Sequence, residues 1–296
     1  MQRNRNDAVA AALCRRAAPH AGGAAWLQLF AVALAALLTG CSTVPITGRS
    51  QLLLVSSQQE MALGLSEFDK LKQNTKVSKD ATWTGILQRV GPRIAAAAKK
   101  DLPNAQWEFL LFDDAKTINA FCLPGGKVAV YTGILPIAKD ENGMATIIGH
   151  EVAHATARHG AERMSQAMLI QAGGAALNAA MESRGAANPQ LFQQLYGIGT
   201  QVGVALPHSR RQELEADRMG LIYMARAGYD PHNAVEMWKR FAAFNRQQGN
   251  TPIAFLSTHP VDEKRIAQLQ QLMPDALKEY TGAPTPAAAP SNPLRR

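Results

Sequence analysis

Two histidines flank a glutamate in the segment His150-Glu151-Val152-Ala153-His154, which has the pattern H-E-x-x-H. Residues four apart lie one above the other on a helix, so both imidazoles can reach one metal ion. Apolar residues at 144, 147, 148 and 152 indicate that the segment is helical. Glu151 is then close enough to hold a water molecule beside the metal without being a ligand. This is the arrangement of a zinc metalloprotease, in which the glutamate takes a proton from a zinc-activated water molecule.

A catalytic zinc ion needs a third protein ligand. His159 lies five residues after His154. On a continuous helix that spacing turns it about 140° away, which favours a structural or supporting role over ligation. Glu213 is the better candidate, and Asp217, four residues on, faces the same way and can accept a hydrogen bond from a ligand imidazole. Glu215 points elsewhere, and we expect it on a solvated charged face.

The first forty residues have the layout of a secretory signal peptide. Arginines precede an apolar run over residues 24–38 that only Gln28 interrupts. Fifteen residues is short for a membrane span, which needs about 20, so a membrane-anchor helix is the less favoured alternative. The run ends in Leu38-Thr39-Gly40-Cys41, which resembles a bacterial lipobox. We therefore expect removal of residues 1–40 and acylation of Cys41. Several acyl chains would anchor the protein stably, and Ser42 favours the outer membrane, with the protein facing the periplasm.

Composition narrows the remaining possibilities. The 296 residues are 47% hydrophobic, which excludes global disorder, and three cysteines exclude a disulfide scaffold. Cys122 is expected to be a small buried apolar residue. The net charge of +8 leaves a nucleic-acid partner open. However, the basic residues are scattered, and no zinc-finger, helix-turn-helix or phosphate-loop pattern occurs. Nucleic acid is therefore not expected as a partner.

The elements that must position these residues follow from periodicity and from turn signals. Residues 41–56 are expected to be a lipid anchor and tether, and residues 57–72 an amphipathic helix. A helix over 80–99 should kink or split at Gly91-Pro92. Three strands that form a small antiparallel sheet are predicted over 107–112, 117–123 and 127–131, with a turn at 124–126 between the last two.

Beyond residue 132 the pattern is helical. Helices are predicted over 141–159, 162–182, 189–205, 209–227, 231–248 and 261–272, with Gly160 ending the first of these. Residues 172–189 are expected to form a mobile helical hairpin or lid, and residues 274–296 a disordered Pro/Ala-rich tail. The expected fold is α+β and mostly helical, with one peptidase domain over 57–273 and the sheet beside the H-E-x-x-H helix.

Taken together, these segments resemble metallopeptidase family 48. These are gluzincins that include the CAAX prenyl protease, the membrane protease HtpX and the mitochondrial protease Oma. The resemblance covers roughly residues 42–272 and is strongest to periplasmic lipoprotein members. It is carried by Asn119-Ala120-Phe121, Pro124-Gly125-Gly126, Tyr131-Thr132-Gly133, the segment from His150 to Gly160, and the segment from Glu213 to Asp217.

The resemblance implies a zincin fold that holds one zinc ion on His150, His154 and Glu213, with Glu151 as the general base. Asp217 matches the family's orienting aspartate. In Thr258-His259-Pro260, His259 matches a histidine that lies over the zinc, where it occupies the open coordination position or assists the transition state. The alternative is a plain loop histidine. Asn119, Ala120 and Phe121 match the edge strand on which these enzymes lay an extended substrate.

Departures from the family limit the function. The transmembrane helices of HtpX and the prenyl protease are absent, so prenylated substrates and intramembrane cleavage are not expected. His208 stands where an aromatic residue is expected. Arg210 has two possible roles, to stabilise an oxyanion or to pair with an acid. The leading hypothesis is a zinc endopeptidase for misfolded or stalled cell-envelope proteins. The alternative is a chaperone for outer-membrane protein assembly that uses the same fold with little proteolysis, with the assembly machinery as a possible partner.

Overall fold

The computed structural model describes residues 41–183, 209–248, 253–260, 262–280 and 282, with the backbone alone over 175–183. Residues 42–296 form one unit of the chain, separate from residues 1–41. The paragraphs below concern the described part of that unit. No helix within it is long and apolar enough to cross a membrane. The predicted signal peptide, the predicted helix over 189–205 and His208 lie outside the described residues.

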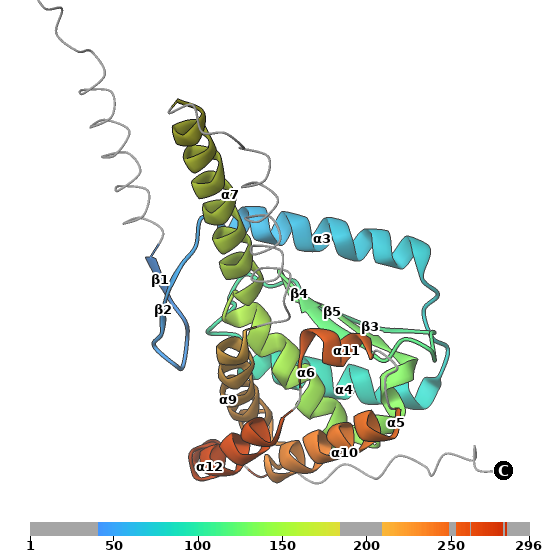
Figure 1. The fold of residues 1–296 in the computed structure, drawn as a ribbon. Helices are drawn as coiled ribbons and strands as arrows, with labels where there is room; N and C mark the ends of the chain where they lie inside the picture. Colours follow the sequence, from blue (N-terminus) through green and yellow to red (C-terminus); the bar gives the residue numbers. More distant parts are fainter. Residues whose placement is uncertain (1–40, 184–208, 249–252, 261, 281, 283–296) are drawn as a thin grey trace, which may run out of the picture. The chain divides into compact units, whose positions relative to one another are not determined.

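A three-stranded sheet lies beside the central helices (Figure 1), in the order β3 (Glu108–Phe112), β5 (Lys127–Tyr131), β4 (Ala120–Leu123). The predicted hairpin of β4 and β5 is present and antiparallel. Gly125 and Gly126 form its turn, both at a φ of 85°, which is costly for other residues. β3 pairs with β5 in parallel, so the sheet is mixed rather than wholly antiparallel. This order leaves β4 as an edge strand.

Two helices carry the chemistry-bearing motifs and lie side by side (Figure 1): α6 (Glu141–Thr156) and α9 (Arg210–Arg226). Asp140 caps α6, and Ser209 forms a capping box with Gln212 at the start of α9. The helices cross at two glycines. A Cβ atom added to Gly220 would lie 2.9 Å from the backbone of Gly149 and His150. The glycines therefore allow the close approach that brings the two motifs together.

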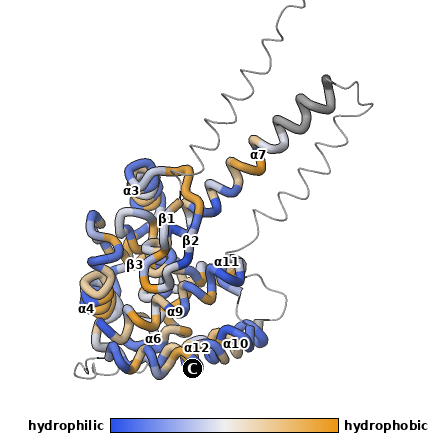
Figure 2. Tube along the Cα trace, turned by 90° about the vertical axis from the view of Figure 1, so that its left-hand side faces the viewer, coloured by the Kyte–Doolittle hydropathy of each residue, from blue (hydrophilic) through white to orange (hydrophobic). Residues whose placement is uncertain are grey.

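The remaining elements enclose this pair. α4 (Ala81–Ala97) packs on α6, α12 (Glu263–Glu279) packs on α9, and α10 (His232–Gln248) contacts both α6 and α12. Apolar side chains from these helices and from the sheet form the main core. In Figure 2, the outer helices α3 (Ser57–Asn74), α10 and α12 carry both hydrophilic and hydrophobic residues along the tube, as expected for helices with one buried face. The short elements are η1 (Thr132–Ile134), α5 (Leu135–Ala138) and α11 (Ala254–Thr258).

Two helix ends differ from expectation, and a predicted split is not present. α6 ends at Thr156 rather than 159, because Arg158 adopts a left-handed conformation (φ 57°) that separates α6 from α7 (His159–Ser183). Arg158 is held there by bonds to Glu60 and to the Val55 carbonyl. α4 is one helix that contains Pro92. α12 continues through Pro274 to Glu279, since Met273 and Ala276 are buried. The prediction of a disordered tail is therefore wrong for residues 274–279, which are helical.

The segment expected to be a tether is also structured. β1 (Cys41–Thr43) and β2 (Ser50–Leu52) form a two-stranded sheet. Val44, Leu53 and Val55 are buried, and the Gln51 side chain donates a hydrogen bond to the Ala157 carbonyl at 3.0 Å. From Ser42 onward the segment is thus part of the folded unit.

Candidate metal centre

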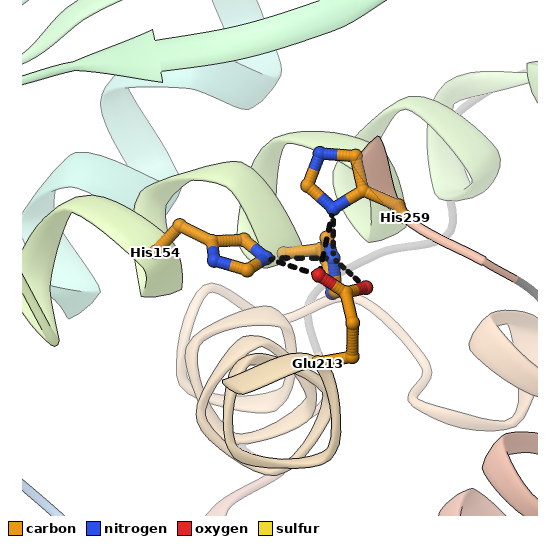
Figure 3. A group of neighbouring side chains, drawn as sticks. His154, Glu213 and His259 are labelled. Atoms are coloured by element: carbon orange, nitrogen blue, oxygen red, sulfur yellow. Dashed lines mark hydrogen bonds and ion pairs between the residues drawn. The ribbon is translucent and has the colours of Figure 1, made fainter. Parts of the chain in front are cut away.

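Four buried side chains from three parts of the chain converge on one point (Figure 3): His150 and His154 from α6, Glu213 from the first turn of α9, and His259 directly after α11. One nitrogen or oxygen of each lies within 4.8 Å of those of the others. The three residues predicted as ligands therefore meet, and His259 joins them.

The spacing of these atoms fits a tetrahedral zinc site. Nε2 of His154 lies 3.1 Å from Nε2 of His150 and 3.2 Å from Oε1 of Glu213. Nδ1 of His259 lies 3.3 Å from Nε2 of His150 and 3.0 Å from Oε1 of Glu213. Ligand atoms about 2.0–2.1 Å from a tetrahedral zinc ion would be about 3.3 Å apart. Three imidazoles and a carboxylate are also the donors that zinc prefers.

The charge of the cluster is also consistent with a bound cation. Burial alone would raise the pKa of the Glu213 carboxyl, but the neighbouring imidazoles hold it far below its usual range. Glu213 is therefore ionised, and a carboxylate 1% exposed needs a positive partner. Arg265 supplies part of that charge, since its Nη1 lies 2.8 Å from Oε2 of Glu213, but the same guanidinium also pairs with Asp217. A metal ion bound by the three imidazoles would supply a second positive charge for the two carboxylates.

Glu151 lies beside this cluster and is also buried. Its Oε1 is 3.5 Å from Nε2 of His259. Burial raises its pKa, and the neighbouring His259 and His150 only partly oppose that effect. A carboxylate whose proton affinity is increased in this way is suited to act as a general base.

Asp217 lies behind the ligand His150: its Oδ1 is 3.0 Å from Nδ1 of that imidazole. Asp217 is itself held by Arg265 of α12, which is also buried and lies over the Trp238 ring at 4.1 Å. Burial alone would raise the pKa of Asp217, but Arg265 and His150 lower it below its usual range. Arg265 could not be predicted as part of the site, because an arginine on a helix is normally exposed to solvent.

A series of hydrogen-bonded side chains supports the ligand His154 on the side away from the cluster. Nδ1 of His159 is 2.8 Å from Nδ1 of His154, and Nε2 of His159 is 3.0 Å from Oε2 of Glu215. Glu215 in turn bonds Arg49 at 2.7 Å and accepts a hydrogen bond from Thr47. The supporting role predicted for His159 agrees with this geometry. The prediction of a solvated Glu215 is wrong: it is 7% exposed, because the segment after Cys41 folds over it.

The predicted substrate strand is at the sheet's edge. Ala120 and Phe121 lie in β4 next to α6, and Asn119 precedes it. Cys122, expected to be buried, is half-buried and packs against the main core. Desolvation together with the charge of Glu151 raises the pKa of its thiol. β4 packs on α6, the helix that carries Glu151, so the edge strand adjoins the helix of the proposed base.

Two further sequence predictions have a structural outcome. Of the two roles left open for Arg210, the structure shows an ion pair with Asp262 at 2.9 Å, in which Arg210 stays 62% exposed. Cys41 is exposed, and its acylation stays a prediction.

Comparison with known proteins identifies the family. The model of peptidase family M48 matches residues 83–273. The chain belongs to peptidase family M48. Mitochondrial metalloendopeptidase OMA1 of Saccharomyces cerevisiae is 32% identical over 269 residues, which cover 83% of this chain and 75% of that protein. Its namesake from Schizosaccharomyces pombe is 39% identical over 191 residues, or 64% of this chain and 52% of that protein.

The chain is also similar to a bacterial protease that is not named OMA1. The beta-barrel assembly-enhancing protease of Escherichia coli is 28% identical over 237 residues, which cover 78% of this chain and 47% of that protein. The chain therefore spans from about half to three quarters of these relatives. The M48 match confirms the predicted family and a metalloprotease. M48 enzymes are zinc-dependent, and the cluster of His150, His154, Glu213 and His259 can hold one such ion.

Proposed function

We propose that this M48 enzyme is an endopeptidase that hydrolyses misfolded or stalled cell-envelope proteins. In this proposal it is held through lipidated Cys41 at the outer membrane, facing the periplasm. The observation that carries the proteolytic part is the convergence of His150, His154 and Glu213 beside a buried Glu151. The resemblance of residues 38–41 to a lipobox supports the location, and the name of the bacterial relative supports a link to beta-barrel assembly.

Each residue of the site has a distinct role in peptide-bond hydrolysis under this proposal. His150, His154 and Glu213 would hold a zinc ion, which would supply Lewis-acid activation of water and of the scissile carbonyl. Glu151 takes the proton from the attacking water and passes it to the leaving amine. Its raised pKa favours proton uptake, and burial of the site strengthens each charge interaction. Asp217 keeps the Nε2 lone pair of His150 directed at the cluster.

The edge of β4 offers backbone groups to a substrate. Tyr131 donates its N–H to the carbonyl of Asn119. The strand register alternates from there, so Phe121 also pairs with β5, while Ala120 and Cys122 turn their backbone groups to the free edge. The Asn119 side chain accepts the N–H of Ala120. An extended substrate would therefore pair with the carbonyl of Ala120 and with Cys122, which imposes little side-chain preference and suits unfolded substrates.

The position of His259 is relevant to the alternative function, that of an assembly chaperone. Its Nδ1 lies within the ligand set, where it would occupy the position that a substrate needs. A site closed in this way favours the second candidate, an assembly chaperone that retains the fold with little proteolysis. Arg210, paired with Asp262, is not assigned to the oxyanion.

The test compares Glu151→Gln with Glu60→Gln, which changes a buried carboxylate that pairs with Arg158 outside the cluster. Cleavage of an unfolded substrate protein and zinc content would be measured in the full chain. We expect Glu151→Gln to retain zinc and lose about 10²–10⁴-fold in cleavage rate, while Glu60→Gln cleaves like the wild type. Equal cleavage by the Glu151→Gln variant would exclude the mechanism. Full complementation of a deletion strain by that variant would favour the chaperone.

A further inference from the structure

The segment that follows Cys41 reaches into the interior beside the metal centre. β1 and β2 are joined by residues 44–49, and the side chain of Arg49 at the end of this turn is 9% exposed. Its guanidinium lies between two carboxylates, 2.7 Å from Glu215 of α9 and 2.6 Å from Glu162 of α7. Arg49 therefore joins the start of the folded unit to the two helices that flank the end of α6.

Glu162 is fixed independently of the metal ligands. It bonds Arg49 through both oxygens, at 2.6 and 2.9 Å, and Gln212 of the α9 capping box donates to it at 2.7 Å. Such a bidentate, charge-assisted arrangement is among the strongest hydrogen-bonded contacts in proteins. Arg49 is thus held in a single orientation, with its Nε–H directed at Glu215.

Hydrogen bonds connect Glu215 through His159 to the proposed metal ligand His154, and in each of them the donor is on the His154 side. Nε2 of His154 faces the cluster, so its proton must be on Nδ1 when Nε2 binds a metal. That N–H donates to Nδ1 of His159, which leaves the proton of His159 on Nε2, where it donates to Glu215. The Glu215 carboxylate accepts from His159, Thr47 and Arg49. The donor and acceptor roles of the His154 and His159 ring nitrogens and of the Glu215 carboxylate are therefore mutually consistent.

We propose that Arg49 and Glu215 are positioning residues of the metal site, and that through His159 they fix the tautomer and ring orientation of His154. The two ligand histidines then have parallel supports. Asp217 contacts His150 directly and is itself held by Arg265. His159 contacts His154, and Glu215 and Arg49 hold His159 in turn. Because Arg49 belongs to the segment after Cys41, that segment is a component of the metal centre. This inference rests on the proposed metal ligands and not on the substrate.

The first experiment measures the zinc dissociation constant of the full chain by competition with a chromophoric chelator. Glu215→Gln is compared with Glu60→Gln, since both replace a buried glutamate that pairs with a buried or half-buried arginine, and both are isosteric. Loss of such a supporting group weakens metal binding about 10–100-fold. We expect that loss in Glu215→Gln and in Arg49→Met, and none in Glu60→Gln. Wild-type zinc affinity in Glu215→Gln would overturn the proposal.

A second pair of variants separates positioning from packing. In His159→Gln the new amide can accept from His154 and donate to Glu215, whereas in His159→Leu it can do neither. We expect the glutamine variant to bind zinc more tightly than the leucine variant. We also expect the cobalt(II)-loaded glutamine variant to keep the visible absorption spectrum of the wild type, and the leucine variant to change it. Equal affinities and equal spectra would show that His159 only fills space.

The same measurements separate this proposal from the proteolytic function. If the wild type binds zinc but cleaves nothing, the proposed function fails, and the order of zinc affinities still decides the role of Arg49 and Glu215. If Glu151→Gln abolishes cleavage while Glu215→Gln keeps wild-type zinc affinity, the function stands and the positioning role fails.

Discussion

Arg265 and Asp217 form a two-point ion pair inside the protein: Nε lies 2.8 Å from Oδ2 and Nη2 lies 2.7 Å from Oδ1. The third guanidinium nitrogen, Nη1, lies 2.8 Å from Oε2 of Glu213. Arg265 therefore contacts both the carboxylate behind His150 and a carboxylate predicted to bind zinc. The two acids on one face of α9 share a single fixed cation.

Removal of this cation should be costly. Arg265→Met would leave Asp217 buried without its positive partner, and breaking a buried pair from one side costs about 3–5 kcal/mol. We expect that loss in the free energy of unfolding, measured with urea, and also weaker zinc binding. The matched control is Arg226→Met, whose pair with Glu279 is 36% and 41% exposed and should contribute at most about 1 kcal/mol. Similar losses in the two variants would contradict this account.

The glycine crossing of α6 and α9 gives a second prediction. A Cβ at position 220 meets the backbone of Gly149 and His150 at 2.9 Å, and backbone cannot move aside as a side chain can. Gly220→Ala should therefore separate the helices and destabilise the protein by about 1–3 kcal/mol. Because His150 is at the crossing, zinc affinity should fall as well.

Gly160 provides the control for that substitution. It lies in α7, and an added Cβ meets no atom within 4 Å. Gly160→Ala should be neutral or stabilising by up to about 1 kcal/mol, since alanine favours the helix. Thermal unfolding and chelator competition on both variants test the pair. A Gly220→Ala variant as stable as Gly160→Ala would show that the crossing is not tightly constrained.

The part of the site that follows from local spacing could be predicted from the sequence. The spacing of His150 and His154, and that of Glu213 and Asp217, fixes which residues share a helix face, because the helical period is constant. The position of His259 at the metal was predicted only from the family resemblance, since a short loop motif does not indicate which residues it contacts. The hairpin of β4 and β5 could be predicted because the Pro124-Gly125-Gly126 turn defines it, whereas the edge position of its first strand came from the family resemblance.

The supports of the site could not be predicted, because they join residues far apart in the chain. The pairing of Arg49 with Glu215 spans 166 positions, and no local periodicity encodes it. The same is true of Arg265 and Asp217. The end of α6 was misplaced because Arg158 takes a left-handed conformation held by Glu60, and Gly160 was the more obvious stop signal. The continuation of α12 through Pro274 depends on burial against α9 and α10.

The acid dependence of stability gives a third prediction. Burial alone would raise the pKa of Glu215, but hydrogen bonds from His159, Thr47 and Arg49 outweigh it and lower the pKa to about 2. A carboxyl whose pKa is lower in the folded state stabilises the protein above its unfolded value of 4.5, and that contribution is lost as the pH falls toward 2. At full strength it is on the order of 3 kcal/mol.

Glu215→Gln should therefore lose part of the wild type's stability at pH 6 and approach the wild type as the pH falls below 4.5. Glu60→Gln should show the opposite trend, because burial raises the pKa of Glu60 despite its bond to Arg158. Urea unfolding of the zinc-free full chain over this pH range measures both. Parallel pH profiles for the two variants would contradict the opposite shifts.

The last prediction concerns the fourth member of the cluster. His259 lies after α11, and α11 is tied to the strand region by the N–H of Phe255, which donates to the carbonyl of Ile118 at 3.1 Å. If His259 contributes a fourth ligand to a site built on three others, His259→Ala should still retain one zinc ion per chain after dialysis. His150→Ala, which removes one of the three helical ligands, should lose it.

The cobalt(II)-loaded His259→Ala variant should also differ in its visible absorption spectrum from the wild type, because a water molecule replaces an imidazole nitrogen. A spectrum identical to that of the wild type would show that His259 does not bind the metal. Its proximity to Glu151, 3.5 Å from Nε2 to Oε1, would then assign it to the proton-transfer side of the site. In that case His259→Ala should lower the cleavage rate at unchanged zinc content, whereas a removable fourth ligand should leave the cleavage rate at least as high as in the wild type.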